Sequence, residues 1–365
     1  MMFDYYMTVI FLAVFVMCIM AMMVQGNDTL DKTVKHKFYA VASAVIAASI
    51  CEWSGVQLDG IQTLPWLRGL HILVKIIEFS AAPMVAVLCA DIIGNIKHKR
   101  VAAVLLLLQS GLEIISGFAG TIFYVDAHNT YGHGRWYGIY PLTFAASILY
   151  FIVVVLRTSQ QNYGTRKRLP VMLVALCLCG LLLQYCSSSV RVIWLCTAID
   201  VLLVYAYYAE IILNTDPLTR LLNRRCYENR CAVLRAPRMV FYFDVDDFKS
   251  VNDTHGHAAG DEVLVAVGAM LREIYGKKGR CYRIGGDEFS ALVEIREDEV
   301  QGYNDAFDQL LAKRRAEDPR LTGVSIGAAF YDPKTGSFSD AVAIADAKMY
   351  ACKKQHKGVH DAACE

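Results

Sequence analysis

Hydrophobic residues are distributed unevenly along the 365-residue chain. Up to about residue 213 long apolar runs dominate, whereas from there to the C-terminus charged residues recur every few positions. A bilayer core about 30 Å thick requires roughly 20 apolar residues in a helix, and several runs in the first part reach that length. The pattern predicts two domains: a helical transmembrane region over 1–213 and a water-exposed domain over 214–365.

The apolar region divides into about seven predicted transmembrane helices. The first run is not followed by a convincing small-residue cleavage site, so it is interpreted as a retained helix rather than a signal peptide. The predicted spans fall near residues 4–25, 38–57, 69–94, 101–124, 136–156, 169–187 and 190–213.

Positive charge in the connecting segments predicts the orientation of these helices. Cytoplasmic loops are enriched in Lys and Arg, so the N-terminus is expected outside and the C-terminal domain in the cytoplasm. An odd number of spans agrees with that arrangement. The first, third and fifth connections carry Lys32, Lys35, Lys37, Lys97, Lys99, Arg100, Arg157, Arg166, Lys167 and Arg168, and the others carry only Arg68, Arg135 and Arg191.

Several polar side chains interrupt the apolar runs. Ionisable residues inside a membrane are costly and usually face a bundle interior or a wet cavity. Two interpretations stay open: a ligand pocket near Glu78 and Glu113, or structural pairing and contact with the interface at helix ends. The outer segment 125–137, with His128 and His133, is a further candidate ligand or metal loop. The polar residues are Glu52, Glu78, Asp91, Glu113, Gln184 and Asp200.

Composition narrows the class of partner. A net charge of +1 provides no basic field of the kind that binds nucleic acid. The twelve cysteines are scattered and form no CxxC pair. They are interpreted as small buried apolar residues rather than as a metal site or a disulfide framework.

Acidic residues follow a buried strand in the polar half. An Asp or Thr before Pro is typical of a helix N-cap, so the segment 214–217 predicts a short helix continuing to about Leu234. The apolar run 239–243 predicts a buried strand, and acids from Asp244 to Asp247 come directly after it. Carboxylates in that place are costly unless they are ion-bound or hydrogen-bonded. They suit a hard divalent cation.

A second acidic pair lies about forty residues further on. Residues 280–284 and 289–293 predict two strands joined by a two-glycine turn, a β-hairpin with Asp287 and Glu288 at its tip. If this hairpin neighbours the first strand in one sheet, Asp244 and Asp287 converge on one cation site. Two metal ions held by shared carboxylates stabilise the charge that develops in phosphoryl or nucleotidyl transfer.

The stretch between the two acidic sites offers a guanine-binding pair, Asn252 and Asp261. An Asp carboxylate can accept hydrogen bonds from the N1–H and the 2-amino group of guanine together, which adenine cannot offer. Taken alone, the same stretch would be read as turn-forming Asn, Asp and Gly residues.

These motifs resemble the GGDEF-domain diguanylate cyclases over about residues 215–358. The resemblance implies a ferredoxin-like, palm-type α/β domain that joins two GTP molecules into cyclic di-GMP and releases pyrophosphate, in a protein of the bacterial inner membrane. The matching motifs are the opening segment 216–225, the strand and helix over 243–264, the hairpin 283–289 and Ser325-Ile326-Gly327.

The resemblance also implies a metal site and a proton acceptor. Two Mg²⁺ ions per active site, with Mn²⁺ as a substitute, would be bound by Asp244, the main-chain carbonyl of Val245, Asp287 and Glu288. Asp287 would accept the proton of the attacking 3′-hydroxyl, and Glu288 would assist.

Substrate contacts follow from the same resemblance. Each domain would bind one GTP, so the active unit is expected to be a homodimer with two-fold symmetry. The bilayer and an unknown sensory ligand are the other expected partners. Guanine would be bound by Asn252 and Asp261, and His257 matches the substrate-site histidine of the family. The phosphates would be bound by the backbone of Asp247 and Phe248 with Lys249, Lys353 and Lys357.

The sequence departs from the family pattern at two places, the inhibitory product site and the end of the last helix. Gly276 and Gly279 occupy the positions of the inhibitory Arg-x-x-Asp product site, so that site is expected to be absent. The last helix ends in His356-Lys357-Gly358, and Lys lacks the bidentate geometry of Arg toward phosphate.

Two other functions stay open. One is a degenerate GGDEF domain that binds GTP and regulates a partner without catalysis. The other is a membrane receptor or transporter with an accessory output domain, although the apolar half shows no inverted repeats of the kind found in transporters.

Overall fold

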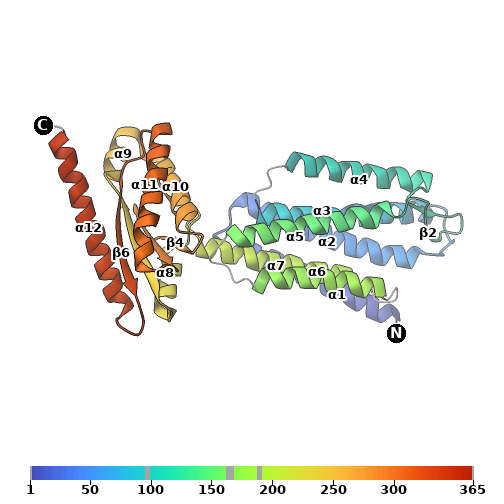
Figure 1. The fold of residues 1–365 in the computed structure, drawn as a ribbon. Coiled ribbons are helices and arrows are strands. Elements are labelled where there is room, and N and C mark those ends of the chain that lie inside the picture. The colour runs from blue at the N-terminus through green and yellow to red at the C-terminus, as the bar shows by residue number, and fades with distance from the viewer. Residues whose placement is uncertain (1, 95–98, 162–167, 187–190, 364–365) are drawn as a thin grey trace. The chain divides into compact units, whose positions relative to one another are not determined.

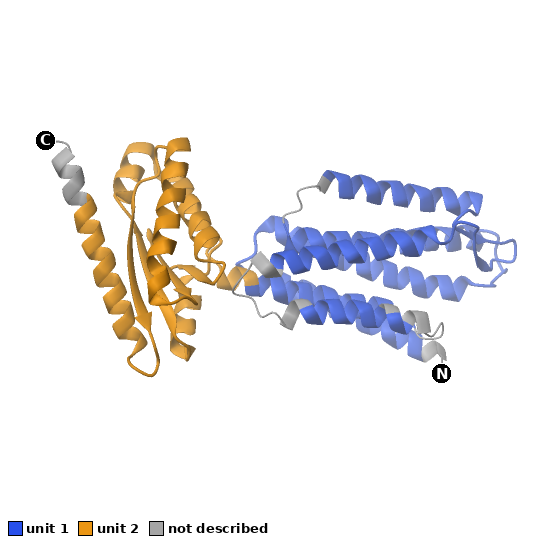
Figure 2. Ribbon diagram, in the orientation of Figure 1, with its two compact units in different colours: residues 1–210 blue, residues 211–365 orange. Residues whose placement is uncertain are grey.

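The computed structural model describes residues 2–94, 99–161, 168–186 and 191–363. The chain divides into two compact units, residues 1–210 and 211–365 (Figure 2). Lys97, Arg166 and Lys167, which contributed to the predicted orientation, lie outside the described residues, as do the side chains of Gln184 and Lys357. The assignment of a function to each part of the chain remains a prediction.

The first unit is a bundle of helices with one small hairpin (Figure 1). Strands β1 (Phe123–Val125) and β2 (Tyr131–His133) form the antiparallel hairpin, and the N-terminus lies at the same end of the bundle as β2 (Figure 1). The helices are α1 (Met2–Gln25), α2 (Lys32–Leu58), α3 (Leu67–Ile93), α4 (Lys99–Ala119), α5 (Ile139–Gln161), α6 (Arg168–Cys186) and α7 (Ile193–Asn214).

Most of these helices have the dimensions of a membrane span. Among the described residues, six helices are long and apolar enough to cross a membrane, and α6 contributes a shorter apolar stretch, Val171–Gly180. Large apolar side chains point out of the bundle: Phe118, Leu107 and Leu142 are 86%, 72% and 70% exposed. Such a surface is unfavourable in water, which is compatible with a membrane protein. The count of seven spans remains a prediction.

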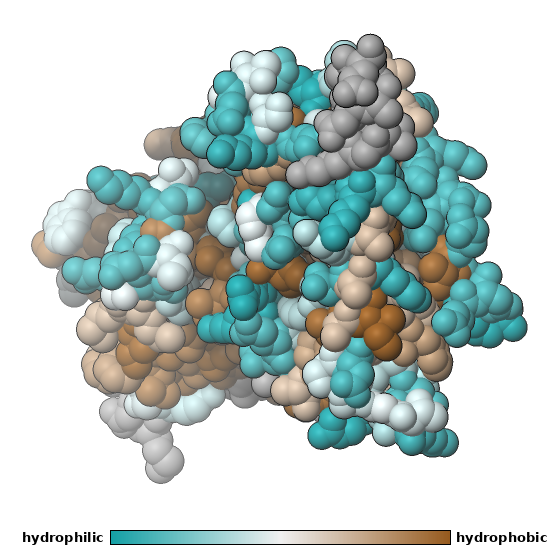
Figure 3. All heavy atoms as spheres, turned by 90° about the vertical axis from the view of Figure 1, so that its left-hand side faces the viewer, coloured by the Kyte–Doolittle hydropathy of each residue, from teal (hydrophilic) through white to brown (hydrophobic). Residues whose placement is uncertain are grey.

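The second unit is built on a four-stranded antiparallel sheet with the strand order β4-β5-β3-β6. The face of the chain that carries α12 is mainly hydrophilic, with scattered apolar residues (Figure 3). This architecture agrees with the predicted ferredoxin-like α/β domain. Its elements are α8 (Arg224–Val233), β3 (Arg238–Val245), α9 (Phe248–His255), α10 (His257–Ile274), β4 (Gly279–Arg283), β5 (Glu288–Val293), α11 (Val300–Glu317), β6 (Val324–Tyr331) and α12 (Phe338–Ala363).

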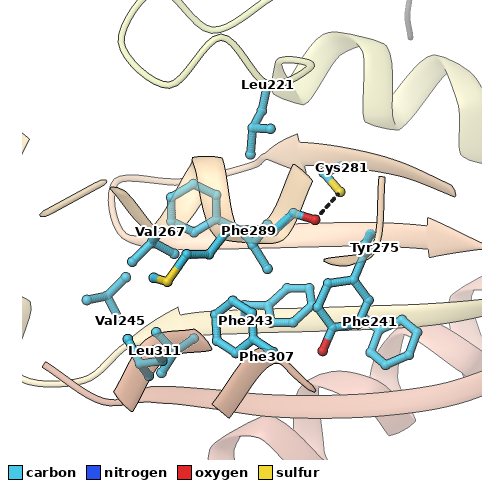
Figure 4. Packing of buried hydrophobic residues seen from close by; sticks show 14 of the residues in the cluster. Leu221, Phe241, Phe243, Val245, Val267, Tyr275, Cys281, Phe289, Phe307 and Leu311 are labelled. Atoms are coloured by element: carbon cyan, nitrogen blue, oxygen red, sulfur yellow. Dashed lines mark hydrogen bonds between the residues drawn. The ribbon is translucent and has the colours of Figure 1, made fainter. Parts of the chain in front are cut away.

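Alternating residues of β3 pack into two hydrophobic clusters, one on each face of the sheet. Phe241 and Phe243 pack with Tyr275 and with residues of α10 and α11 on one face of the sheet (Figure 4). Val240 packs on the other face, in a cluster with residues of α8 and α12. Because successive side chains of a strand point to opposite faces, Asp244 falls on the face that α12 covers.

Gly327 in β6 allows α12 to lie close to the sheet. A Cβ at this position would overlap the carbonyl oxygen of Ala345 and the backbone nitrogen of Met349. Any larger residue would therefore push the helix away from the strand. The glycine of the Ser-Ile-Gly motif thus sets the distance from which α12 side chains reach Asp244.

The segment after α7 does not form the predicted helix. Helix α8 begins only at Arg224, and its N-cap is Asn223, whose side chain accepts a hydrogen bond from the Cys226 N–H. Arg220 has a left-handed φ of 59°, and Leu222 forms β-bridges with Thr215 and Tyr282. The predicted start was wrong because the Asp-Pro pair begins a turn rather than a helix, whereas the predicted end is confirmed, since Leu234 is the C-cap residue of α8.

Candidate active site

The two acidic motifs lie on neighbouring strands. β3 pairs with β5 in antiparallel register, and Asp244 stands opposite Glu288. The backbone N–H of Val245 donates to the carbonyl oxygen of Asp287 over 3.2 Å. The predicted condition for a shared site, a hairpin beside the first strand, is therefore met.

A tight turn presents the acids of the hairpin. The N–H groups of Ile284 and Gly285 both donate to the carbonyl oxygen of Glu288, over 3.0 and 3.2 Å. A Cβ at Gly285 would collide with the Glu288 side chain, whereas a Cβ at Gly286 would meet no neighbour. Gly285 thus leaves room for the Glu288 side chain in its present position, and a larger residue would displace that carboxylate.

The acidic cluster concentrates negative charge in a half-buried place. Burial raises the pKa of Asp244, and the carboxylates of Asp287 and Asp246 act in the same direction, while Lys353 opposes them. Burial, followed by the charges of Asp244 and Asp287, likewise raises the pKa of Glu288. The cluster therefore favours a bound cation that would relieve this repulsion.

Lys353 of α12 supplies one such cation from within the chain. Its ammonium donates a hydrogen bond to the Asp244 carboxylate. Partial burial alone would lower the pKa of Lys353, but the contact with Asp244 outweighs that effect and raises it. The lysine predicted to bind phosphate thus contacts Asp244, the acid predicted to bind a metal ion.

The residues of the site have the chemistry of a magnesium site. Their donors are carboxylate and carbonyl oxygens, the ligands that Mg²⁺ prefers. Within the described part of the chain, no group of three or more His, Cys, Asp or Glu side chains is already gathered at metal-ligand spacing. Asp244 and Glu288 nevertheless lie next to other carboxylates, and burial together with these charges raises the pKa of both. A divalent ion would relieve this repulsion, and Asp244, Val245, Asp287 and Glu288 would bind it.

The turn from β3 to α9 carries the predicted phosphate contacts. Asp247 has a left-handed φ of 51° although it is not a glycine, and it is the N-cap residue of α9. Residues in such a conformation cluster at functional sites, and the first N–H groups of a helix lack intrahelical partners and attract anions. Asp247 and Lys249 are exposed, so both are accessible to a ligand.

The predicted guanine contacts, and the predicted substrate-site histidine His257, come from two packed helices. Asn252 belongs to α9, while His257 and Asp261 belong to α10. A Cβ at Gly260 would overlap Oδ1 of Asn252, so Asn252 lies directly against the residue that precedes Asp261. Asn252 is half-buried and the other two are exposed. Guanine binding by Asn252 and Asp261, and substrate binding by His257, remain predictions.

Arg283 is a residue that the sequence did not single out. Its Nε and Nη2 both donate to the carbonyl oxygen of Gly286, over 3.1 and 2.7 Å. Its Nη1 donates to the carboxylate of Asp216 over 3.1 Å. Arg283 therefore ties the two-glycine turn to the opening segment of the domain, a role that no pattern in the sequence reveals.

A second unforeseen group joins α12 to the end of β3. The Ser325 hydroxyl donates to Oδ1 of Asp246 over 2.6 Å, and Nδ1 of His356 lies 2.7 Å from the other carboxylate oxygen. The Ser-Ile-Gly motif thus contributes a hydroxyl as well as a glycine. The side chain of Lys357, one residue on, is outside the described residues.

Comparison with known proteins identifies the second unit. A family model described as "Diguanylate cyclase, GGDEF domain" matches residues 213–358. An uncharacterised 19.3 kDa protein of Streptomyces ambofaciens is 37% identical over 142 residues, which cover 38% of this chain and 77% of that protein. The chain belongs to the GGDEF family. The resemblance inferred from the four sequence motifs is thereby confirmed.

Several of the similar proteins are named diguanylate cyclases. Diguanylate cyclase DgcP of Escherichia coli is 32% identical over 49% of this chain and 53% of its own length. DgcN of the same organism is 39% identical over 26% of this chain and 25% of its own length. The GGDEF domain of DgcB from Caulobacter crescentus, solved with c-di-GMP, is 28% identical, with a TM-score of 0.35 over 39% of this chain and 91% of that chain. This chain therefore spans about half of DgcP and a quarter of DgcN.

Proposed function

We propose that the chain is a membrane-bound diguanylate cyclase that condenses two GTP molecules into cyclic di-GMP and pyrophosphate. The observation that carries the proposal is the pairing of Asp244 with Glu288 beside Asp287, inside a GGDEF domain matched over residues 213–358. Each of the acids on which the family chemistry depends is in place. This favours catalysis over a degenerate domain that only binds GTP.

The proposed mechanism assigns a task to each group of residues. Asn252 and Asp261 bind the guanine, and His257 contacts the substrate. The backbone of Asp247 and Phe248 binds the triphosphate, together with Lys249, Lys353 and Lys357. Two bound Mg²⁺ ions, or Mn²⁺ in their place, would neutralise charge that develops on the phosphates.

The acids of the hairpin act on the nucleophile. Asp287 accepts the proton of the 3′-hydroxyl, assisted by Glu288. In the structure, the ammonium of Lys353 contacts the Asp244 carboxylate. In the proposed mechanism the same ammonium also interacts with the triphosphate.

Two domains must meet for the cyclic product to form, because each 3′-hydroxyl attacks the α-phosphate of the other nucleotide. The active unit is thus proposed to be a homodimer. The apolar helices hold it in the bacterial inner membrane, with the N-terminus outside and the GGDEF domain in the cytoplasm. A signal received by the helical region regulates the reaction.

The test is the product itself. Full-length protein is incubated with GTP and Mg²⁺, and the products are analysed by mass spectrometry beside D287A and D305A, which removes an exposed acid of α11. Cyclic di-GMP from the wild type and D305A, but not from D287A, supports the proposal. No product, even when residues 211–365 are dimerised artificially, would contradict it and favour a GTP-binding regulator.

A further inference from the structure

The helical unit contains a partly open cavity of about 670 Å³. That volume is in the range of small-molecule sites, roughly 300–1,000 Å³. Its walls come from α2, α3, α5, α6 and α7 and from the β1–β2 hairpin with the segment after it. The family match begins at residue 213, after the last residue of the lining, Val204, so the cavity lies outside the matched GGDEF domain.

The charges that line the cavity are not balanced. Lys75 pairs with Glu78 over 2.8 Å, and Arg191 lies 3.7 Å from Glu52. Asp200 has no ion-pair partner among the described residues, although its side chain lies in an apolar wall. Four carboxyl groups against two permanent cations therefore line the cavity: Glu52, Asp59, Glu78 and Asp200 against Lys75 and Arg191.

Two buried polar atoms of the lining have no hydrogen-bond partner among the described residues. Asp200 is 7% exposed; its Oδ2 accepts a hydrogen bond from the Cys177 thiol over 3.0 Å, and its Oδ1 has no partner among the described residues. His71 is fully buried, and its Nε2 is likewise without a partner in the described part of the chain. Such atoms are costly unless something satisfies them.

Both of these atoms are hydrogen-bond acceptors. The Asn129 amide nitrogen donates to the carbonyl oxygens of Leu58 and Ile61, which fixes its Oδ1 as the acceptor toward Nδ1 of His71, 3.2 Å away. Nδ1 of His71 must then carry the proton, which leaves Nε2 with a lone pair in the neutral ring. A ligand that satisfies His71 or Asp200 must therefore be a donor.

The rings of the cavity already stabilise an ammonium group. The Lys75 nitrogen lies 4.9 Å from the centroid of the Tyr131 ring and 6.0 Å from that of Phe79. Phe79 stacks in turn on Tyr140, with a centroid distance of 4.3 Å. Aromatic faces attract cations in this geometry, and the rest of the lining is mostly aliphatic or aromatic.

We propose that this cavity binds a small hydrophobic organic amine, with its ammonium group on Asp200 and its apolar body against the aromatic and aliphatic lining. The inference deepens the proposed sensory role of the helical region and takes its biological meaning from that role. Binding is measured without reference to cyclase activity. Absence of cyclase activity would therefore not contradict a positive binding result, and absence of amine binding would not contradict the proposed cyclase activity.

The test compares two probes of one shape and opposite charge. Full-length protein in dodecyl maltoside is titrated with phenethylamine and with 3-phenylpropanoate. Tryptophan fluorescence is the readout, because all four tryptophans precede residue 211 and Trp194 lines the cavity. We expect a saturable change with the amine and none with the carboxylate, a comparison that requires no variant.

Variants locate the binding group. D200N should weaken phenethylamine binding by roughly tenfold or more, because it removes a desolvated charge partner, and D200E, which keeps the charge, should retain it. The matched control is E113Q, since Glu113 is a fully buried acid of α4 that is not among the cavity residues. A rise of the melting temperature with added amine in the wild type and E113Q, but not in D200N, is the second measurement.

The outcomes separate cleanly. Preference for the carboxylate probe, equal binding of both probes, or unchanged affinity in D200N would overturn the proposal. Added phosphatidylethanolamine distinguishes two sources of the amine: displacement of the probe supports a lipid headgroup as the ligand, and undiminished probe binding supports a free amine.

Discussion

At the scale of single residues, Arg283 shows how the signature turn is held. Its guanidinium makes two hydrogen bonds to the Gly286 carbonyl and one to Asp216, and its side chain is only 15% exposed. These contacts fix the backbone on which Asp287 and Glu288 stand. Arg283 touches none of the proposed reacting groups, so it is a positioning residue.

R283A should therefore lower kcat by roughly tenfold to a hundredfold, since small displacements of catalytic groups have effects of that order. Pyrophosphate release at saturating GTP measures the change. R280A is the matched control, because Arg280 lies in the same strand but its side chain is exposed. Equal activity in R283A and R280A would contradict a role for Arg283 in holding the turn.

Asp216 gives a prediction about pH. Partial burial alone would raise its pKa, but hydrogen bonds from Thr219 and the Arg283 guanidinium outweigh burial and lower it. A carboxyl whose pKa is depressed by folding stabilises the protein above its unfolded pKa, roughly 3.9, and loses this contribution as the pH falls through the folded pKa. D216N should thus cost about 1–3 kcal/mol at pH 7.

Calorimetric unfolding of the full-length protein between pH 7 and pH 3 checks this dependence. The difference between wild type and D216N should be constant down to about pH 4 and should then shrink. D305N, in which an exposed acid of α11 is replaced, serves as the control. A difference that persists undiminished at pH 3 would be inconsistent with a stabilising carboxylate.

The sequence indicated the acidic residues of the candidate site, because charged side chains are unusual at the end of a buried strand. Acids after a buried strand were visible because no packing argument explains them, and the register of Asp244 with Glu288 agrees with that interpretation. Asp216 was misjudged as a helix cap because its partner, Arg283, is 67 residues away. Contacts over such distances depend on the folded sheet, which local pattern does not encode.

At the scale of elements, α12 is held against the sheet by contacts with β6 and with the residue that follows β3. Gly327 permits close contact, and His356 and Ser325 hold opposite oxygens of Asp246. The same helix carries Lys353. The strands and the hairpin could be predicted from apolar runs and turn residues, whereas the clamp on α12 requires knowledge of which face of β3 the helix covers.

H356A should loosen this clamp and raise the KM for GTP severalfold, with a smaller change in kcat, because the lysines proposed to bind the triphosphate lie on the same helix. The loss of a whole hydrogen bond to a charged group, about 1.5–3 kcal/mol, would raise KM by roughly tenfold to a hundredfold and is the upper limit, because the phosphate contacts are affected only indirectly. Steady-state kinetics with Q355A, an exposed neighbour, as the control would test it. A fall in kcat with KM unchanged would contradict the clamp.

At the scale of the whole molecule, the cavity illustrates what the sequence left open. A ligand pocket near Glu78 and Glu113 was one of two interpretations; Glu78 lines the cavity, but Glu113 does not. The other interpretation placed Glu52, Asp91 and Asp200 near helix ends, in contact with the interface. Asp91 does lie near the end of α3, where it pairs with Lys37 over 2.5 Å. Glu52 and Asp200 are instead buried and line the cavity, so that interpretation was wrong for them. Residues from five helices and a hairpin define the lining, so no single stretch of sequence could indicate it.

Continuity between the two units gives the last prediction. Helix α7 ends at Asn214, and the first β-bridge of the GGDEF domain is formed by Thr215, so no separate linker intervenes. If rotation of α7 sets how two cyclase domains face each other, activity should follow the helical period. Inserting one to four alanines after Leu213 turns the domain by roughly 100° per residue. We expect activity to fall with two residues and to recover with four, and equal activity across the series would argue against coupling through α7.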